Sequence, residues 1–143
     1  MNILIINGPN LNFLGIREPN IYGKETYSDL SSFLVNTAVD LGLNIEIFQS
    51  NHEGAIIDKL QEAYFNKVDG IVINAGAYTH YSYAILDAIK STMIPTIEVH
   101  LSDITKRESF RANSVIRPAC IASYFGKGFE SYKDALVHFK NNL

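Results

Sequence analysis

Short runs of aliphatic residues alternate along the chain with longer stretches whose apolar residues recur every three or four positions. The runs are predicted to be strands, and they are Ile3 to Ile6, Asn44 to Phe48, Gly70 to Ile73, Thr96 to Val99 and Cys120 to Phe125. Runs rich in Ile and Val are typical of strands that are buried on both faces. The second run is more polar, which predicts that it lies at an edge of the sheet.

The first longer stretch predicts an amphipathic helix. Its apolar face consists of Leu30, Phe33, Leu34, Ala38 and Leu41. Thr26, followed three residues later by Asp29, predicts the N-cap of this helix. Gly42 predicts its end, because glycine adopts the left-handed conformation that often terminates helices.

The alternation of strands and helices predicts the fold class. Comparable apolar faces recur within 56–64, 84–89 and 132–139. Strands that alternate with helices imply right-handed crossovers and a parallel sheet. We therefore expect an α/β fold, a flavodoxin-like three-layer sandwich with a five-stranded parallel sheet, in which residues 1–143 form a single catalytic domain.

Composition narrows the class of protein. The chain has 143 residues, a net charge of −3, 47% hydrophobic residues and 19% charged residues, which is typical of a globular domain. Its one cysteine cannot form an internal disulfide, which favours a reducing, cytoplasmic location. The mild acidity argues against a nucleic-acid partner, and no apolar run is long enough for a membrane span. The apolar start is interpreted as a strand and not as a signal peptide.

Polar residues gather where the predicted strands end. Ligands of parallel α/β sheets bind beyond the carboxyl ends of the strands. Three of the four histidines, His52, His80 and His100, follow predicted strands and are expected on one rim. The fourth, His138, lies in the last predicted helix and is expected to be structural.

Glu98 and His100 form the first candidate pair for chemistry. They are two residues apart on a predicted strand, so both side chains point to one face. A carboxylate beside an imidazole selects its tautomer and raises its basicity, which suits a general acid. The alternative is a satisfied polar pair at a strand end.

The connection from Gly8 to Gly23 is long for a strand-to-helix link, and such loops at a binding rim are often lids. It contains Arg17 and, five residues later, Tyr22. A guanidinium that favours the phenolate can make a tyrosine a general base. The alternative is a surface arginine and a packing tyrosine.

Arg107 and Arg111 are four residues apart and would share a face if Ile104 to Phe110 were helical. Arginine side chains suit carboxylates and paired hydroxyls. The alternative is a solvated face on which Glu108 is a nearby counter-charge.

Several other chemistries lack a motif. The glycines form neither a dinucleotide-binding fingerprint nor a P-loop, and the histidines lack the spacing of a metal site. A nucleophile elbow is absent, and Cys120 falls within a predicted strand. A non-catalytic small-molecule binding module and a metal-dependent lyase or hydrolase remain alternatives to a cofactor-free enzyme.

Five segments together resemble a known family. They are INGPNLNFLGIREPNIYG (6–23), QSNHEG (49–54), INAGAYTH (73–80), IEVHLSD (97–103) and RESFR (107–111). In this order and spacing they resemble the type II 3-dehydroquinate dehydratases, across nearly the whole chain. The resemblance implies dehydration of 3-dehydroquinate to 3-dehydroshikimate in the shikimate pathway to chorismate and aromatic amino acids. It implies an enolate intermediate without Schiff base, metal or organic cofactor.

The resemblance also implies catalytic roles. Tyr22 would remove the proton next to the ketone, and Arg17 would stabilise its phenolate. Asn10 would help to hold a water molecule that stabilises the enolate oxygen. His100 would protonate the departing hydroxyl, oriented by Glu98.

Substrate-binding roles follow from the same resemblance. Asn74, His80 and Arg111 would bind the hydroxyls and the carboxylate of the substrate. Leu101 would contribute a backbone contact and Ser102 a hydroxyl contact.

The family assembles as a dodecamer, a tetramer of trimers, so the resemblance implies a homo-oligomer. Asp87 matches a family residue that reaches the site of a neighbouring subunit. The departures from the family pattern are modest: Ala77, Tyr78 and Asp103 concern pocket shape, whereas Arg117 and Cys120 lie in a less typical region around the fifth strand.

Overall fold

One parallel sheet forms the centre of the molecule. The computed structural model describes the backbone of residues 1–143 and every side chain except that of Tyr22. The strands are β1 (Asn2–Asn7), β2 (Asn44–Gln49), β3 (Gly70–Asn74), β4 (Thr96–His100) and β5 (Ala122–Phe125). They pair in the order β2-β1-β3-β4-β5, and every pair is parallel. This order confirms the predicted flavodoxin-like α/β class and places the polar second strand at a sheet edge.

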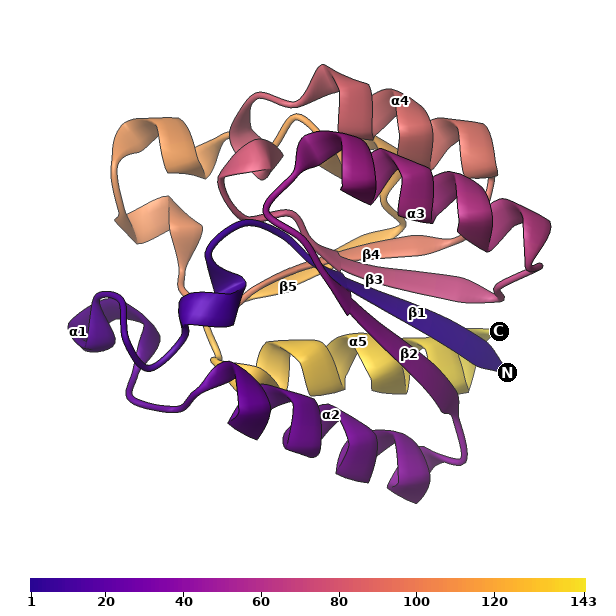
Figure 1. Ribbon diagram of the computed structural model, residues 1–143, viewed down its shortest axis with the longest axis horizontal. Coiled ribbons are helices and arrows are strands. Elements are labelled where there is room, and N and C mark those ends of the chain that lie inside the picture. The colour runs from indigo at the N-terminus through magenta and orange to yellow at the C-terminus, as the bar shows by residue number, and fades with distance from the viewer.

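Helices cover both faces of the sheet (Figure 1). One layer contains α2 (Tyr27–Leu41) and α5 (Phe129–Asn142), and the other contains α3 (Glu53–Phe65) and α4 (Tyr83–Thr92). The shorter helical segments are α1 (Pro19–Tyr22), η1 (Leu11–Phe13), η2 (Gly76–His80), η3 (Ile104–Lys106), η4 (Ser109–Ala112) and η5 (Arg117–Ala119). Over the part of the chain that is described, no helix is both long enough and apolar enough to cross a membrane.

The core consists of two apolar layers, one on each side of the sheet. Along β1, Ile3 and Ile5 pack with the α2 and α5 side, whereas Leu4 and Ile6 pack with the α3 and α4 side. All four side chains are buried, which explains why the strand reads as a continuous aliphatic run. Polar side chains are therefore confined mainly to strand ends and to the edge.

Local capping explains the length of α2. The Thr26 hydroxyl accepts a hydrogen bond from the Asp29 amide, and the Thr26 amide donates to the Asp29 carboxylate. Gly42 ends the helix with φ 69°, a left-handed conformation that costs glycine little. The predicted start and end of this helix are both confirmed.

The fifth strand begins later than predicted. Cys120 follows the 3₁₀ turn η5 and is not part of the strand, which begins at Ala122. The chain joins the sheet just before this point, where the Ile121 amide donates to the Thr96 carbonyl at 2.8 Å. The prediction was wrong because Cys120 and Ile121 extend the apolar pattern, although regular pairing with β4 begins only at Ala122.

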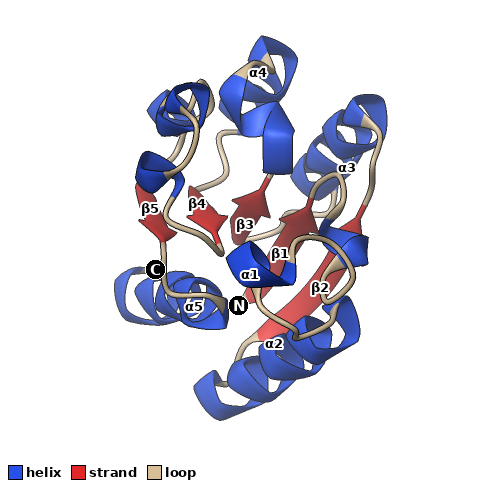
Figure 2. Cartoon of the chain, turned by 90° about the vertical axis from the view of Figure 1, so that its left-hand side faces the viewer, coloured by secondary structure: helices blue, strands red, loops and turns tan.

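The carboxyl ends of the strands point toward one end of the molecule, which Figure 2 shows from that end. Gly8 lies there, directly after β1, and its amide donates to the Asn74 carbonyl at 2.7 Å. A Cβ atom at Gly8 would meet the carbonyl carbon and oxygen of Ala75 at 2.6 Å. The close approach of these two loops therefore requires glycine at this position.

Replacing Gly8 with alanine is expected to lower the free energy of unfolding by about 1–3 kcal/mol, because backbone atoms would have to separate. Gly54→Ala is the matched control. Gly54 lies in the first turn of α3 with open space around its Cα atom, so alanine should raise stability by about 0.5–1 kcal/mol. Urea denaturation of both variants measures the difference, and equal stabilities would contradict this account of Gly8.

Candidate active site

A cavity of about 120 Å³ lies at the carboxyl ends of the central strands. Residues that end β3 and β4, or that follow β1, β3 and β4, line it. They are Pro9, Asn10, Leu11, Arg17, Asn74, Gly76, Ala77, His80, His100, Leu101, Ser102, Ile104, Arg107 and Arg111. The lining includes three arginines and no carboxylate among the described side chains. The permanently charged side chains of the lining are therefore all cationic, although the chain carries a net charge of −3.

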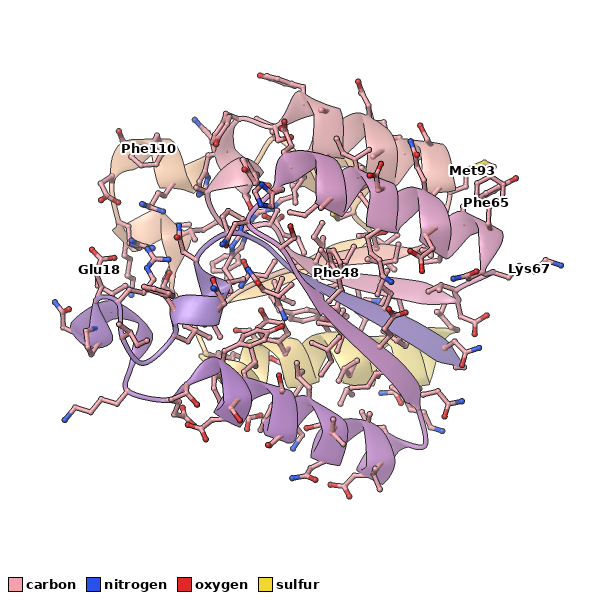
Figure 3. All side chains as sticks on the ribbon, in the orientation of Figure 1. Glu18, Phe48, Phe65, Lys67, Met93 and Phe110 are labelled. Carbon is pink, nitrogen blue, oxygen red and sulfur yellow. The ribbon has the colours of Figure 1, made fainter. Side chains whose placement is uncertain are left out.

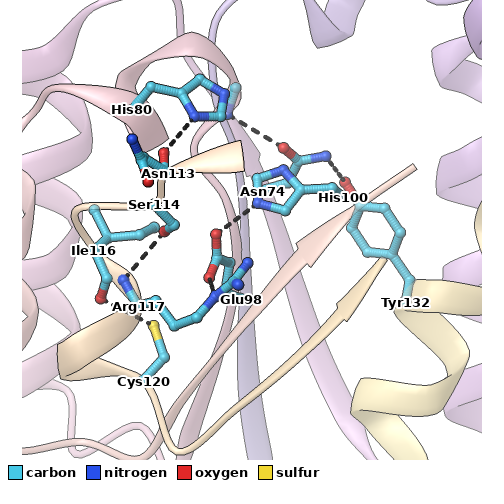
Figure 4. A network of polar contacts seen from close by, with 11 residues as sticks. Asn74, His80, Glu98, His100, Asn113, Ser114, Ile116, Arg117, Cys120 and Tyr132 are labelled. Carbon is cyan, nitrogen blue, oxygen red and sulfur yellow. Dashed lines mark hydrogen bonds and ion pairs between the residues drawn. The ribbon is translucent and has the colours of Figure 1, made fainter. Parts of the chain in front are cut away.

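His100 and Glu98 are joined by a short hydrogen bond at the end of β4 (Figure 4). The imidazole Nε2 lies 2.6 Å from Oε2 of Glu98, and the carboxylate is fully buried. Burial alone would raise the pKa of Glu98, but the hydrogen bond and charge of His100 and the ion pair with Arg117 lower it to about 2. Because an ionised carboxylate can only accept, Nε2 carries a hydrogen. Nδ1 is left to exchange a proton with a bound molecule.

His80 lies across the cavity from β4, at the end of η2. Its ring is stacked at 6.5 Å from the ring of His100 and meets Phe110 edge-on at 5.8 Å. Its Nδ1 donates to the backbone carbonyl of Asn113 at 2.8 Å. Partial burial, together with the charges of His100 and Arg111, lowers the pKa of His80, although the bond to Asn113 opposes this shift. A neutral His80 can offer Nε2 as an acceptor for a hydroxyl group.

Asn74 is fixed by the scaffold beneath the cavity. Its Nδ2 donates to the Tyr132 hydroxyl at 3.0 Å, and its Oδ1 accepts from the Gly76 amide at 3.2 Å. The Tyr132 hydroxyl in turn donates to Oδ1 of Asn7 at 2.6 Å. Tyr132 is fully buried on α5, so the last helix determines how the ends of β1 and β3 present their side chains.

The loop after β1 is held by the loop after β2. Asn10 has a left-handed backbone, with φ 69°, and its amide donates to Oδ1 of Asn51. Gln49 Nε2 donates to the same Oδ1 and to the carbonyl of Gly8. Asparagine tolerates this conformation better than most residues, and such strain often accompanies functional sites.

Three cavity arginines, Arg17, Arg107 and Arg111, come from two different loops. Arg17 contacts Glu18 at 3.4 Å, and the same carboxylate lies 4.0 Å from Arg107. Arg111 donates to Glu108 at 2.6 Å and stacks over the ring of its neighbour Phe110. Glu18 and Phe110 therefore mark the cavity end of the molecule, whereas Phe65 and Met93 lie at the other end (Figure 3).

Most predicted site residues lie together in the cavity wall. They are Asn10, Arg17, Asn74, His80, His100, Leu101, Ser102 and Arg111. Glu98 lies directly behind His100 on β4. Asp87 is exposed on α4 and does not line this cavity, and His52 is exposed at the start of α3, away from the lining. The side chain of Tyr22 lies outside the described residues.

The sequence analysis named Arg107 and Arg111 but missed Tyr132 and the contact made by Arg117. Arg107 and Arg111 both line the cavity, but not through a shared helix, because the segment breaks into η3 and η4. Their common role was predictable from charge and spacing alone. Tyr132 carried no signal, since it reads as one more aromatic residue on an apolar helix face. Arg117 carried none either, because its contact with Glu98 depends on the turn before β5.

The described side chains include no group of three or more His, Cys, Asp or Glu residues arranged to hold a metal ion. The lining also contains no lysine among those side chains. What the cavity offers is an oriented histidine, several arginines and fixed amide groups. These groups can bind an anion with several hydroxyls and move a proton at one of them.

Comparisons with known proteins agree with this chemistry. The family model described as dehydroquinase class II matches residues 1–140. A 3-dehydroquinate dehydratase from Caldicellulosiruptor bescii is 60% identical, covering 99% of this chain and 97% of that protein. One from Clostridium acetobutylicum is 58% identical over 100% of this chain and 99% of that protein. The crystal structure of a type II dehydroquinase from Butyrivibrio crossotus superposes with a TM-score of 0.95 at 55% identity, covering 99% and 98% of the two chains.

Removing the Tyr132 hydroxyl should show how much its hydrogen bonds with Asn7 and Asn74 contribute to the free energy of unfolding. Tyr132→Phe leaves buried groups of Asn7 and Asn74 without a partner and is expected to lower the free energy of unfolding by about 1–3 kcal/mol. Tyr124→Phe is the control, because its hydroxyl contacts only the part-buried His138, at 2.8 Å, and should cost less than about 1 kcal/mol. Chemical denaturation would contradict this account if the control proved the more costly variant.

Proposed function

The chain belongs to the class II dehydroquinases and is a 3-dehydroquinate dehydratase of the shikimate pathway, and we propose that the cavity side chains divide its reaction into two proton transfers. The reaction removes water from 3-dehydroquinate and is a hydro-lyase reaction. The observation that carries the proposal is the His100–Glu98 pair, oriented at the wall of an arginine-lined cavity.

The substrate matches the charge and polarity of the cavity. It is a carboxylate that also carries a ketone and several hydroxyls. Arg111 and the other cavity arginines supply positive charge for the carboxylate. His80, Asn74 and Ser102 supply aimed polar groups for hydroxyls, and the backbone of Leu101 completes this wall.

Tyr22 removes the proton next to the ketone in the first step. The support is its position in the sequence, five residues after Arg17, which lines the cavity. A guanidinium near the phenol favours the phenolate that a base requires. The resulting enolate needs stabilisation, and Asn10 is suited to hold a water molecule against its oxygen.

His100 protonates the departing hydroxyl in the second step. Hydroxide is a poor leaving group at neutral pH, so an acid must supply a proton as the bond breaks. Nδ1 of His100 is the ring nitrogen that remains for this transfer, because Nε2 is bonded to Glu98. No step in this scheme calls for a metal, a Schiff base or an organic cofactor.

We further propose that the enzyme works as a homo-oligomer, a dodecamer built as a tetramer of trimers, in the cytoplasm. Asp87 supports the oligomer, since it is exposed on α4 and does not line the cavity of its own chain. Its carboxylate is available to a neighbouring subunit's site. The single cysteine supports a reducing compartment.

The role of Tyr22 is tested by Tyr22→Phe, with product followed by the ultraviolet absorbance of the conjugated enone. We expect kcat to fall by about 10²- to 10⁴-fold, because the general base is lost, while a substrate analogue still binds. Tyr64→Phe is the control, since Tyr64 is exposed on α3 away from the cavity and its loss should leave turnover unchanged. Substantial activity in Tyr22→Phe would exclude Tyr22 as the base.

The absence of a covalent imine in the scheme is tested separately. Borohydride added during turnover reduces any Schiff base to a stable lysine adduct. We expect mass spectrometry to find the unmodified chain and activity to persist. A lysine that gains the mass of the reduced substrate would overturn the enolate scheme.

A further inference from the structure

Arg117 contacts the catalytic pair from outside the cavity. Its Nε donates to Oε1 of Glu98 at 2.8 Å, while His100 bonds to Oε2 at 2.6 Å (Figure 4). Each oxygen of the carboxylate therefore has its own cationic or cation-forming partner. Arg117 does not line the cavity, so it cannot act on the substrate directly.

The surroundings of Arg117 hold it in this position. Its amide donates to the Ser114 hydroxyl at 3.2 Å, and its guanidinium lies 5.6 Å from the centre of the Phe125 ring. Its Nη2 atom is buried and has no hydrogen-bond partner among the described residues. The side chain as a whole is 37% exposed, so solvent screens part of its charge, but the buried part of the guanidinium faces the Glu98 carboxylate.

A buried carboxylate between two such partners has a balanced charge. Glu98 is fully buried, and a carboxylate buried alone would favour its neutral form. With Arg117 present, the three groups carry no net charge when His100 is neutral and one positive charge when it is protonated. Without Arg117, Glu98 and His100 together would carry one negative charge when His100 is neutral and no net charge when it is protonated. The pair would therefore hold its proton more tightly.

We infer that Arg117 is a positioning residue for the general acid: it orients the Glu98 carboxylate toward His100 and offsets its charge, which makes the proton of His100 easier to release. The inference rests on the proposed role of His100 as the proton donor. It extends that role to a residue outside the substrate cavity.

Other charged and titratable groups also face the pair and are part of the same field. The cavity arginines and His80 lie on the substrate side. On the other side is Cys120, and burial, followed by the charge of Glu98, raises the pKa of this thiol to about 12, so it is neutral. Of these groups, Arg117 is the cation bonded to Glu98 itself.

The test measures kcat and KM against pH in Arg117→Met, Arg117→Gln and Arg117→Lys. In Arg117→Met and Arg117→Gln the alkaline limb of the kcat profile should move to higher pH by about one unit, because the His100–Glu98 pair loses its proton at a higher pH. The plateau of kcat should fall about tenfold, since a weaker acid protonates the leaving group less well. KM should stay unchanged, and Arg117→Lys should restore the limb toward its original position.

Matched controls separate the loss of the positive charge bonded to Glu98 from the loss of a positive charge elsewhere on the protein. Lys127→Met also removes one positive charge, but Lys127 pairs with Asp134 at the surface, so its profile should match that of the parent enzyme. In a Glu98→Gln background, Arg117→Met should move the limb less than it does in the parent enzyme, because the part of its effect that passes through the carboxylate is already lost. Thermal unfolding of each variant confirms that the folded enzyme is being compared.

The outcomes distinguish this inference from the role of His100 itself. A limb that stays in place in Arg117→Met and Arg117→Gln, or that fails to return in Arg117→Lys, overturns the inference. His100→Gln should abolish the limb altogether. If the limb persists in His100→Gln, the proposed role of His100 is wrong, whatever Arg117 does.

Discussion

Parallel strands buried on both faces leave a protein one natural place for polar chemistry, the edge where all the strands end. In this chain Asn7 and Asn74 are register partners at the ends of β1 and β3, and His100 ends β4. Their side chains meet there because the strand interiors, such as Ile3 to Ile6, are committed to the two apolar layers. The cavity is thus a consequence of the sheet order, and the long loops after β1 and β4 add the arginines that give it charge.

Glu98 is the exception to this arrangement, because it places a carboxylate within a strand instead of beyond it. A charge in such a position is tolerated only when hydrogen-bonded partners compensate for its lost hydration. His100 and Arg117 supply this compensation, each at a different oxygen of the carboxylate. The same pairing that makes the buried charge possible also leaves Nδ1 as the nitrogen of His100 that is not bonded to Glu98.

The sequence predicted those features that depend on neighbours along the chain. Strands appeared as aliphatic runs, and Thr26 and Gly42 marked the ends of α2 through local capping. The spacing of Glu98 and His100 placed both on one face of β4, and family motifs located most of the cavity wall. The sequence did not predict contacts between distant segments. Tyr132 bonds to Asn74 across 58 positions, and Arg117 bonds to Glu98 from a turn 19 positions away. The sequence marks Arg117 only as a departure from the family pattern and Tyr132 only as part of an apolar helix face, because the partner of each is determined by the fold.

The bond between Tyr132 and Asn7 joins residues 125 positions apart, which has a consequence for how the molecule forms. β1 can pair with β2 and β3 early, and Asn7 Nδ2 can donate to Tyr27 of α2, but Oδ1 of Asn7 lacks its Tyr132 partner until α5 docks. During synthesis on the ribosome, the chain must emerge at least as far as Tyr132 before this can happen. Contacts of such long range slow folding. The polar end of β1 is therefore among the last regions to acquire all its native hydrogen bonds, after the first strands of the sheet have paired.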